Sequence, residues 1–262
     1  MTQEQRNKAI QMLIDDFKPQ IKVEQPIQTP LLSIVTIYDE QNEAKWLCEF
    51  IENLPKVQDG IIEVILCKNV RDGATKERPK APELRNGIII HYVMHYFKEW
   101  NFADARNVAQ TAASGKWILA LDTDEMLIPN QVQTLIELCE NGTADAYSLK
   151  AYSLLEGDKF DIAPVTRLFK NNEKIVWRCG IHETVLFSIY DNDLKHEDTN
   201  ITIFHAGYNQ DKDVLIKKLS RNLDMICREY AKTTHSHMKN YLKLHLTNTV
   251  KELERYEQEN RD

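Results

Sequence analysis

Phe102-Ala-Asp-Ala-Arg-Asn107 begins the stretch that decides the fold, and Lys116-Trp-Ile-Leu-Ala-Leu-Asp-Thr-Asp-Glu125 ends it. Small apolar residues recur at helical spacing after the first part, and Ser114-Gly115 is a typical helix end, so we expect a helix and a tight turn. The apolar run from Trp117 to Leu121 then predicts a strand buried on both faces. Three carboxylates follow at the carboxyl end of this strand, where open α/β sheets bind ligands: Asp122, Asp124 and Glu125.

Strands and helices alternate on the amino-terminal side of this stretch. Apolar runs at residues 31–37, 61–67 and 88–93 predict buried strands. An amphipathic segment that ends near Leu54 predicts a helix between the first two of them. Because strand, helix and strand in this order form parallel sheets with right-handed crossovers, we expect an α/β fold with a mostly parallel central sheet and helices on both faces.

The pattern changes after residue 143. Short alternating runs predict a small extension of antiparallel strands and hairpins, at residues 147–154, 165–169, 175–177, 184–189 and 201–205. Two further helices are expected at residues 211–230 and 235–257. We therefore expect four regions, namely an N-terminal amphipathic helix with a linker (1–30), an α/β half (31–143), a half with short strands (144–210) and a C-terminal helical appendage (211–262).

Composition narrows the class of protein. The chain has 33 basic and 40 acidic residues, a formal net charge of −7 with the signs interspersed, which argues against a strongly electrostatic binder of nucleic acid or membranes. Its five cysteines form no CxxC motif, so we expect free thiols. No signal peptide is recognisable, and no apolar run approaches the ~20 residues of a membrane-spanning helix. We expect a cytoplasmic protein that associates with a membrane at most peripherally.

Asp122-Thr-Asp124 is the most specific feature for chemistry. If the chain is still extended there, side chains two residues apart project the same way, and both carboxylates can face one ligand. Mg²⁺ and Mn²⁺ take carboxylate oxygens and complete their shell with water and substrate phosphates. Acidic residues are also common where a strand merely becomes a loop, so the metal hypothesis depends on the position after a buried strand.

The chain resembles a family-2 glycosyltransferase of the GT-A fold. The matching elements occur in the expected order from about residue 31 to 208: Ser33-Ile-Val-Thr-Ile37 with Asn42-Glu43, Phe102-x-x-Ala105-Arg106-Asn107, Asp122-x-Asp124-Glu125, Arg167-Leu-Phe169, Gly180-Ile-His182-Glu183 and His205-Ala-Gly207-Tyr208. The resemblance implies transfer of a sugar from a nucleotide-sugar donor, with inversion at the anomeric carbon. Residues 31–143 would then bind the donor, with a UDP-sugar as the expected compound, and residues 144–210 would face the acceptor.

The resemblance implies roles on the donor side. Asp122 would lie near the ribose, and Asp124 would hold Mn²⁺ or Mg²⁺ on the diphosphate, where the ion stabilises the charge of the leaving group. Arg106 would donate a bidentate hydrogen bond to phosphate or to the carboxylates, or would only tie the helix to the loop. Asp39 and Glu43 would meet the base or ribose, unless they cap the following helix.

His182-Glu183 forms the second cluster. Inversion by direct displacement requires a base that accepts the proton of the acceptor hydroxyl. We assign this role to Glu183, with Asp161 as the competing base. His182 would be a metal ligand or line the active site, and His205 would reach the diphosphate or the metal. A purely structural role is the alternative for both histidines.

One position departs from the family. The family usually carries an acidic residue at the end of the second strand, where this chain has Cys67, so Asp72 or Asn69 would have to recognise the base. The missing carboxylate keeps open a catalytically inactive binding module, although an inactive site would not need the acidic and histidine residues that remain. A nucleotidyltransferase would typically have a glycine-rich loop after the first strand, and residues 38–41 contain no glycine.

The acceptor cannot be read from any motif. A polysaccharide, a lipid-linked glycan, a protein side chain and a modified nucleic-acid base all fit the sequence. The C-terminal helices would form an acceptor platform, a homodimer interface or simple packing against the core.

Overall fold

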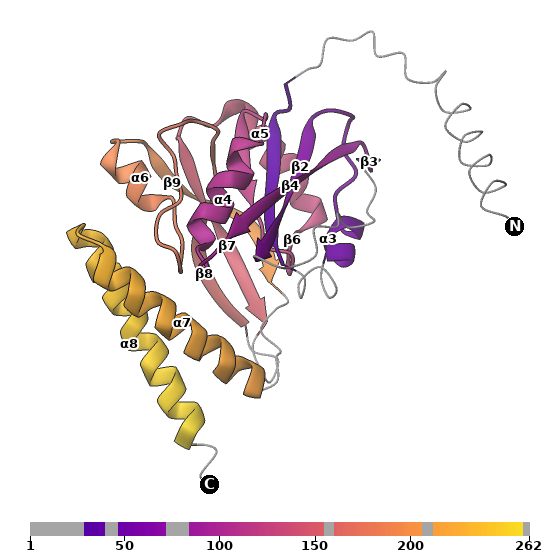
Figure 1. The fold of residues 1–262 in the computed structure, drawn as a ribbon. Helices are drawn as coiled ribbons and strands as arrows, with labels where there is room; N and C mark the ends of the chain where they lie inside the picture. Colours follow the sequence, from indigo (N-terminus) through magenta and orange to yellow (C-terminus); the bar gives the residue numbers. More distant parts are fainter. Residues whose placement is uncertain (1–28, 40–46, 72–83, 155–159, 206–211, 259–262) are drawn as a thin grey trace, which may run out of the picture.

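A single nine-stranded sheet organises the computed structural model (Figure 1). The structure describes residues 29–39, 47–71, 84–154, 160–205 and 212–258. The N-terminal amphipathic helix that the sequence predicts lies outside these residues. The strands are β1 (Leu32–Tyr38), β2 (Ile62–Arg71), β3 (Leu84–Arg85), β4 (Ile88–Phe97), β5 (Trp117–Ala120), β6 (Glu125–Leu127), β7 (Ala146–Leu154), β8 (Phe160–Lys170) and β9 (His196–His205). Their order is β3-β4-β2-β1-β5-β8-β7-β9-β6, so the sheet continues through both expected halves.

The first half is the parallel α/β unit that the sequence predicts. β1 pairs in parallel with β2 and β5, and β2 pairs in parallel with β4. The helices are α3 (Cys48–Glu52), α4 (Phe102–Thr111) and α5 (Val132–Asn141), with a 3₁₀ turn at Pro129–Gln131. β2 and β4 extend four residues beyond the predicted ends, and the described part of the helix near Leu54 is short.

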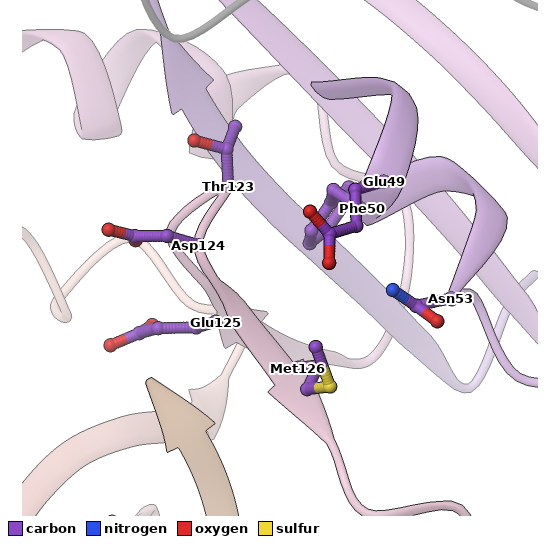
Figure 2. Close-up of a pocket in the computed structure, with 7 residues that line it drawn as sticks. All are labelled: Glu49, Phe50, Asn53, Thr123, Asp124, Glu125 and Met126. Atoms are coloured by element: carbon purple, nitrogen blue, oxygen red, sulfur yellow. The ribbon is translucent and has the colours of Figure 1, made fainter. Parts of the chain in front are cut away.

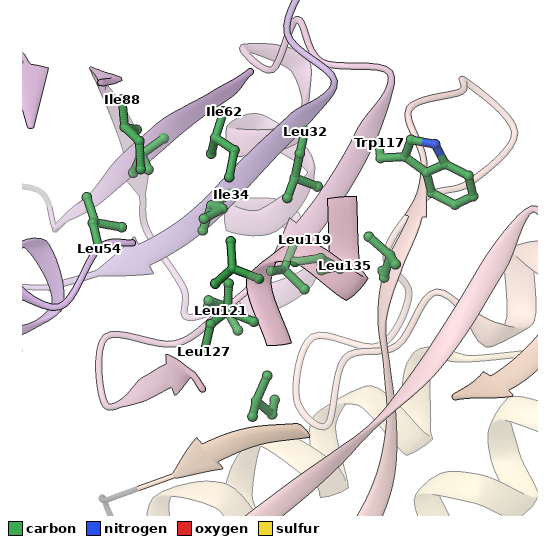
Figure 3. Packing of buried hydrophobic residues seen from close by; sticks show 14 of the residues in the cluster. Leu32, Ile34, Leu54, Ile62, Ile88, Trp117, Leu119, Leu121, Leu127 and Leu135 are labelled. Carbon is green, nitrogen blue, oxygen red and sulfur yellow. The ribbon is translucent and has the colours of Figure 1, made fainter. Parts of the chain in front are cut away.

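Successive residues of β1 enter two separate cores. Leu32 and Ile34 pack with apolar residues of α3 and α5 on one face (Figure 3). Val35 and Ile37 pack on the other face with the alanines of α4 and with Ile189. Because a strand alternates its side chains between faces, a continuous apolar run is what burial on both faces requires.

A buried carboxylate fixes the turn between α4 and β5. Glu63 on β2 accepts hydrogen bonds from Ser33 Oγ at 2.6 Å and from the backbone amides of Ser114 at 2.6 Å and Gly115 at 3.1 Å. A Cβ atom at Gly115 would lie 2.7 Å from the Ser33 backbone nitrogen, so only glycine allows this approach. The turn therefore sets where β5 begins, and with it the position of the acidic residues that follow.

The second half differs from the prediction in two places. β7 and β8 form the expected antiparallel pair, but β9 runs parallel to β7 because a long connection that contains α6 (Leu186–Asp191) separates β8 from β9. The strand predicted at residues 184–189 is wrong, since α6 occupies most of it, and the run at 175–177 forms no strand. Val185 and Ile189, both fully buried, are spaced four apart, which is one face of a helix.

The two C-terminal helices are confirmed. α7 (Lys212–Lys232) and α8 (Ser236–Gln258) lie side by side as a hairpin (Figure 1). Buried residues of both helices form an apolar cluster with Cys179 and Ile181 of the body. All five cysteines are free thiols, as expected. Within the described part of the chain, no helix is both long and apolar enough to cross a bilayer.

Candidate active site

Two arginines converge on Asp122. Arg106 of α4 is only 2% exposed, and its Nη2 donates to Asp122 Oδ1 at 2.7 Å. Arg167 of β8 donates from Nη2 to Asp122 Oδ2 at 3.0 Å. Burial would raise the pKa of Asp122, but the two guanidinium groups outweigh it and hold the pKa well below its usual range. Asp122 is therefore an anion at neutral pH, held from two sides.

Arg106 also contacts the second cluster that the sequence singles out. Its Nε donates to Glu183 Oε1 at 2.7 Å, and its guanidinium lies 4.9 Å from the centre of the Trp177 ring. One buried side chain thus bridges Asp122 and Glu183, which lie 61 positions apart in the sequence. The sequence leaves open whether Arg106 contacts phosphate or carboxylates, and the structure shows contacts to the carboxylates of Asp122 and Glu183.

The chain is not extended at Asp122-Thr-Asp124, so the expectation that both carboxylates project the same way is wrong. A turn follows Leu121, in which the backbone N–H of Glu125 donates to the Asp122 carbonyl at 3.0 Å. Asp122 points to the arginines, whereas Asp124 faces a histidine. Glu125 is buried and supports the turn, because its carboxylate accepts from the Asp122 backbone N–H at 2.9 Å and from Arg167 at 3.3 Å.

Asp124 and His205 form a pair at the carboxyl end of β9. His205 Nε2 lies 3.3 Å from Asp124 Oδ2, and each side chain is 21% exposed. Burial lowers the pKa of His205, but the hydrogen bond and the charge of Asp124 raise it above its usual value overall. Ser153 Oγ lies 3.4 Å from the other ring nitrogen, Nδ1, and so orients the imidazole.

A small open hollow lies beside this pair. Figure 2 shows Thr123, Asp124 and Glu125 on one side of it, with Glu49 and Phe50 of α3 and Asn53, which directly follows α3, opposite them. The hollow thus separates the acidic turn from the first helix of the α/β half.

His182 occupies a different environment. Its ring stacks on His245 of α8 with 3.9 Å between ring centres, and burial together with His245 lowers its pKa to about 4. In the ranges that the structure describes, no group of three or more His, Cys, Asp or Glu side chains is arranged to hold a metal ion. Of the three metal ligands expected from the sequence, the structure brings together Asp124 and His205.

Asp161, the competing base, lies on β8 in an exposed position. It is in register with Ser153 of β7, and Ser153 is in register with His205 of β9. Because neighbouring strands lie about 4.8 Å apart, the backbones of Asp161 and His205 are about 10 Å apart. Residues in register share a face of the sheet, so both side chains lie on the same face. Asp161 therefore remains close to the candidate site.

Of the residues expected near the nucleotide base of the donor, the structure describes only some. Asp39 directly follows β1, and its charge acts on Arg221 of α7, whose pKa burial lowers. Glu43 and Asp72 lie outside the described residues. Cys67 is fully buried in the core, and burial raises the pKa of its thiol to about 12, so it cannot replace the family's carboxylate. Asn69 Oδ1 lies 3.1 Å from His95 Nδ1.

Sequence reasoning missed the roles of several residues in these contacts. Arg167 belongs to one of the matching motifs, but the motif alone assigns it no partner. Ser153, Trp177, Tyr241 and His245 have no local sequence signal, because each meets its partner through packing of elements that are distant in the chain.

Replacing Arg106 by methionine should lower the free energy of unfolding by about 3 kcal/mol, because Glu183 loses the buried guanidinium that it contacts and Asp122 keeps only Arg167. Urea unfolding followed by circular dichroism measures the loss. Arg228→Met is the matched control: Arg228 is exposed and forms an i,i+4 pair with Asp224 that should contribute at most about 1 kcal/mol. Equal effects of the two substitutions would contradict the bridging role of Arg106.

The family model described as glycosyl transferase family 2 matches residues 33–214. A TPR repeat-containing protein from Synechococcus elongatus is 29% identical over 167 residues, which are 61% of this chain and 39% of that protein. The glycosyltransferase GlyG from Streptococcus pneumoniae is 28% identical over 129 residues, which are 48% of this chain and 40% of GlyG. The chain thus spans about two fifths of the length of these curated relatives.

A solved structure supports the fold. The mannosyltransferase PcManGT from Pyrobaculum calidifontis, in complex with GDP-Man and Mn²⁺, superposes with a TM-score of 0.53 at 13% identity, over 89% of this chain and 76% of that one. At this identity the similarity indicates the fold, which is GT-A as expected.

Proposed function

The chain belongs to glycosyl transferase family 2, and we propose that it moves a sugar from a nucleoside-diphosphate sugar to an acceptor, with inversion and with the help of a divalent metal ion. The observation that carries the proposal is the bridge through Arg106, which holds Asp122 on one side and Glu183 on the other. A carboxylate proposed to face the donor and a carboxylate proposed to act as base therefore share one guanidinium.

Asp124 and His205 fit a bound Mn²⁺ or Mg²⁺. A carboxylate oxygen and an imidazole nitrogen lie 3.3 Å apart, and both side chains are partly accessible. Two protein ligands suffice when diphosphate oxygens and water complete the shell. When bound, the ion would stabilise the negative charge on the departing nucleoside diphosphate. The chain holds the carboxylate oxygen and the imidazole nitrogen together, and Ser153 contacts the other ring nitrogen of His205.

Glu183 is suited to accept a proton. Its Oε1 accepts from Arg106, whereas its Oε2 has no hydrogen-bond partner within the described ranges, and the side chain is 14% exposed. In the proposed step an acceptor hydroxyl oxygen bonds to the anomeric carbon as the bond from that carbon to the diphosphate breaks. The hydroxyl proton passes to Glu183 Oε2. Asp161 remains the competing base.

We propose different roles for successive regions of the chain. Residues 31–143 would bind the donor, residues 144–210 would face the acceptor, and the helices at 211–262 would add to the acceptor side. UDP-sugars are the first donors to test. GDP-sugars come next, because the structural neighbour PcManGT was solved with GDP-Man.

Binding of UDP or GDP with and without Mn²⁺ tests the proposal. We expect one nucleoside diphosphate to raise the melting temperature when Mn²⁺ is present and to have little effect in EDTA. A screen of nucleotide sugars for metal-dependent release of that nucleotide then identifies the donor. Binding without turnover would favour the inactive module, and release of pyrophosphate from a nucleoside triphosphate would favour a nucleotidyltransferase. No metal-linked nucleotide binding at all would contradict the proposed mechanism.

A further inference from the structure

The loop that carries Glu183 is tight and strained. Arg178 and Thr184 close it through two backbone hydrogen bonds of 2.9 Å and 3.0 Å. Within it, Cys179 and His182 have φ values of 68° and 52°, a left-handed conformation that costs residues other than glycine about 1 kcal/mol or more. Such a loop keeps its shape only if its surroundings hold it.

Helix α8 holds the loop at His182. The Tyr241 hydroxyl donates to the His182 carbonyl at 3.0 Å, and the His245 ring stacks on the His182 ring at 3.9 Å and 17°. The Tyr241 ring in turn meets the His245 ring edge-on, with 4.4 Å between centres. Burial lowers the pKa of both histidines, so two neutral rings stack without charge repulsion at neutral pH.

Helix α4 holds the same loop from its other side. The Phe102 backbone N–H donates to the Gly180 carbonyl at 2.8 Å, and Arg106 donates to Glu183. Cys179 and Ile181 insert between these contacts into the apolar cluster of α7 and α8. The loop is therefore clamped between the helix that carries Arg106 and the C-terminal helix pair.

We propose that Tyr241 and His245 are positioning residues for Glu183, and that the C-terminal helix pair is part of the catalytic apparatus. The inference rests on the proposed function, in which Glu183 is the base. By fixing the carbonyl and the ring of His182, the two side chains set the backbone direction from which Glu183 leaves the loop. Without them the strained φ at His182 can relax, and the carboxylate leaves the position that Arg106 and the acceptor require.

Kinetics of α8 variants of the full chain test the proposal. We expect His245→Ala and Tyr241→Phe to lower kcat roughly 10- to 100-fold while the KM for the donor changes little. His245→Phe keeps a stacking ring and should restore most of kcat. Leu244→Ala, which changes an exposed neighbour on the same helix, should behave like the wild type. Wild-type kcat in both His245→Ala and Tyr241→Phe would overturn the proposal.

A double-mutant cycle separates positioning from general stability. In a Glu183→Gln background, His245→Ala should lower the residual kcat by less than about 2-fold, because the group that it positions is already gone. If His245→Ala lowers kcat in the Glu183→Gln background as much as it does in the wild type, or if it also weakens metal-linked nucleotide binding, then α8 acts on the whole fold. Either result would overturn the proposal. If Glu183→Gln alone keeps wild-type kcat, the assignment of the base is wrong instead, which is a failure of the proposed function.

Discussion

Glu183→Gln should lower kcat by about 10²–10⁴-fold and leave metal-linked binding of the nucleotide nearly unchanged. Glutamine has the same shape as glutamate. Its amide oxygen can still accept the hydrogen bond from Arg106 Nε, which lies 2.7 Å from Glu183 Oε1 in the wild type. It cannot take a proton from an acceptor hydroxyl. Steady-state kinetics at saturating donor measure kcat, and calorimetric titration of the nucleotide with Mn²⁺ measures binding.

Two further variants make this result specific. Asp161→Asn removes the competing carboxylate, whose backbone lies about 10 Å from that of His205, two strand spacings away. Glu140→Gln changes an exposed glutamate near the end of α5 and controls for loss of a surface charge. If Asp161→Asn abolishes turnover while Glu183→Gln does not, Asp161 is the base and Arg106 serves a structural role.

The parallel half of the fold could be predicted because local sequence carries its constraints. A strand covered on both faces must be apolar without interruption, and the residues of β1 and β5 satisfy this rule. Gly115 reads as a helix end, and the structure adds the reason, namely the contact with Ser33 below the turn. The second half depends on pairings between distant strands. No local pattern shows that β9 runs parallel to β7, and only the four-residue spacing of Val185 and Ile189 indicates a helix at residues 186–191.

The candidate site divides in the same way. Asp122, Asp124, Arg106, Glu183 and His205 could be named from their motifs, and the structure joins them into two contacting groups. The directions of Asp122 and Asp124 could not be predicted, because one hydrogen bond from Glu125 to the Asp122 carbonyl turns the chain after Leu121. The contacts of α8 with the loop were equally hidden. The apolar periodicity of α8 predicts a helix, but it does not identify the loop that Tyr241 and His245 contact.

Asp124→Asn should lower kcat/KM by a factor on the order of 10³, because a metal ion on the leaving diphosphate is expected to contribute several kcal/mol. The asparagine amide is a neutral and weaker metal ligand. The substitution also removes the carboxylate oxygen that lies 3.3 Å from His205 Nε2. The variant should therefore bind the nucleotide equally well with Mn²⁺ and with EDTA. This loss of metal dependence separates it from Glu183→Gln, which should retain the dependence.

The control for Asp124→Asn is Asp198→Asn, an exposed change on β9, seven positions before His205. It should keep both the rate and the metal dependence of the wild type. His205→Ala should move in the same direction as Asp124→Asn, since the two side chains are proposed to share one ion. If Asp124→Asn keeps wild-type metal-linked binding and turnover, the ion is not held at this turn. The pairing of Asp124 with His205 would then be a structural contact between β9 and the turn before β6, and the register of β6 and β9 already brings Glu125 opposite His205.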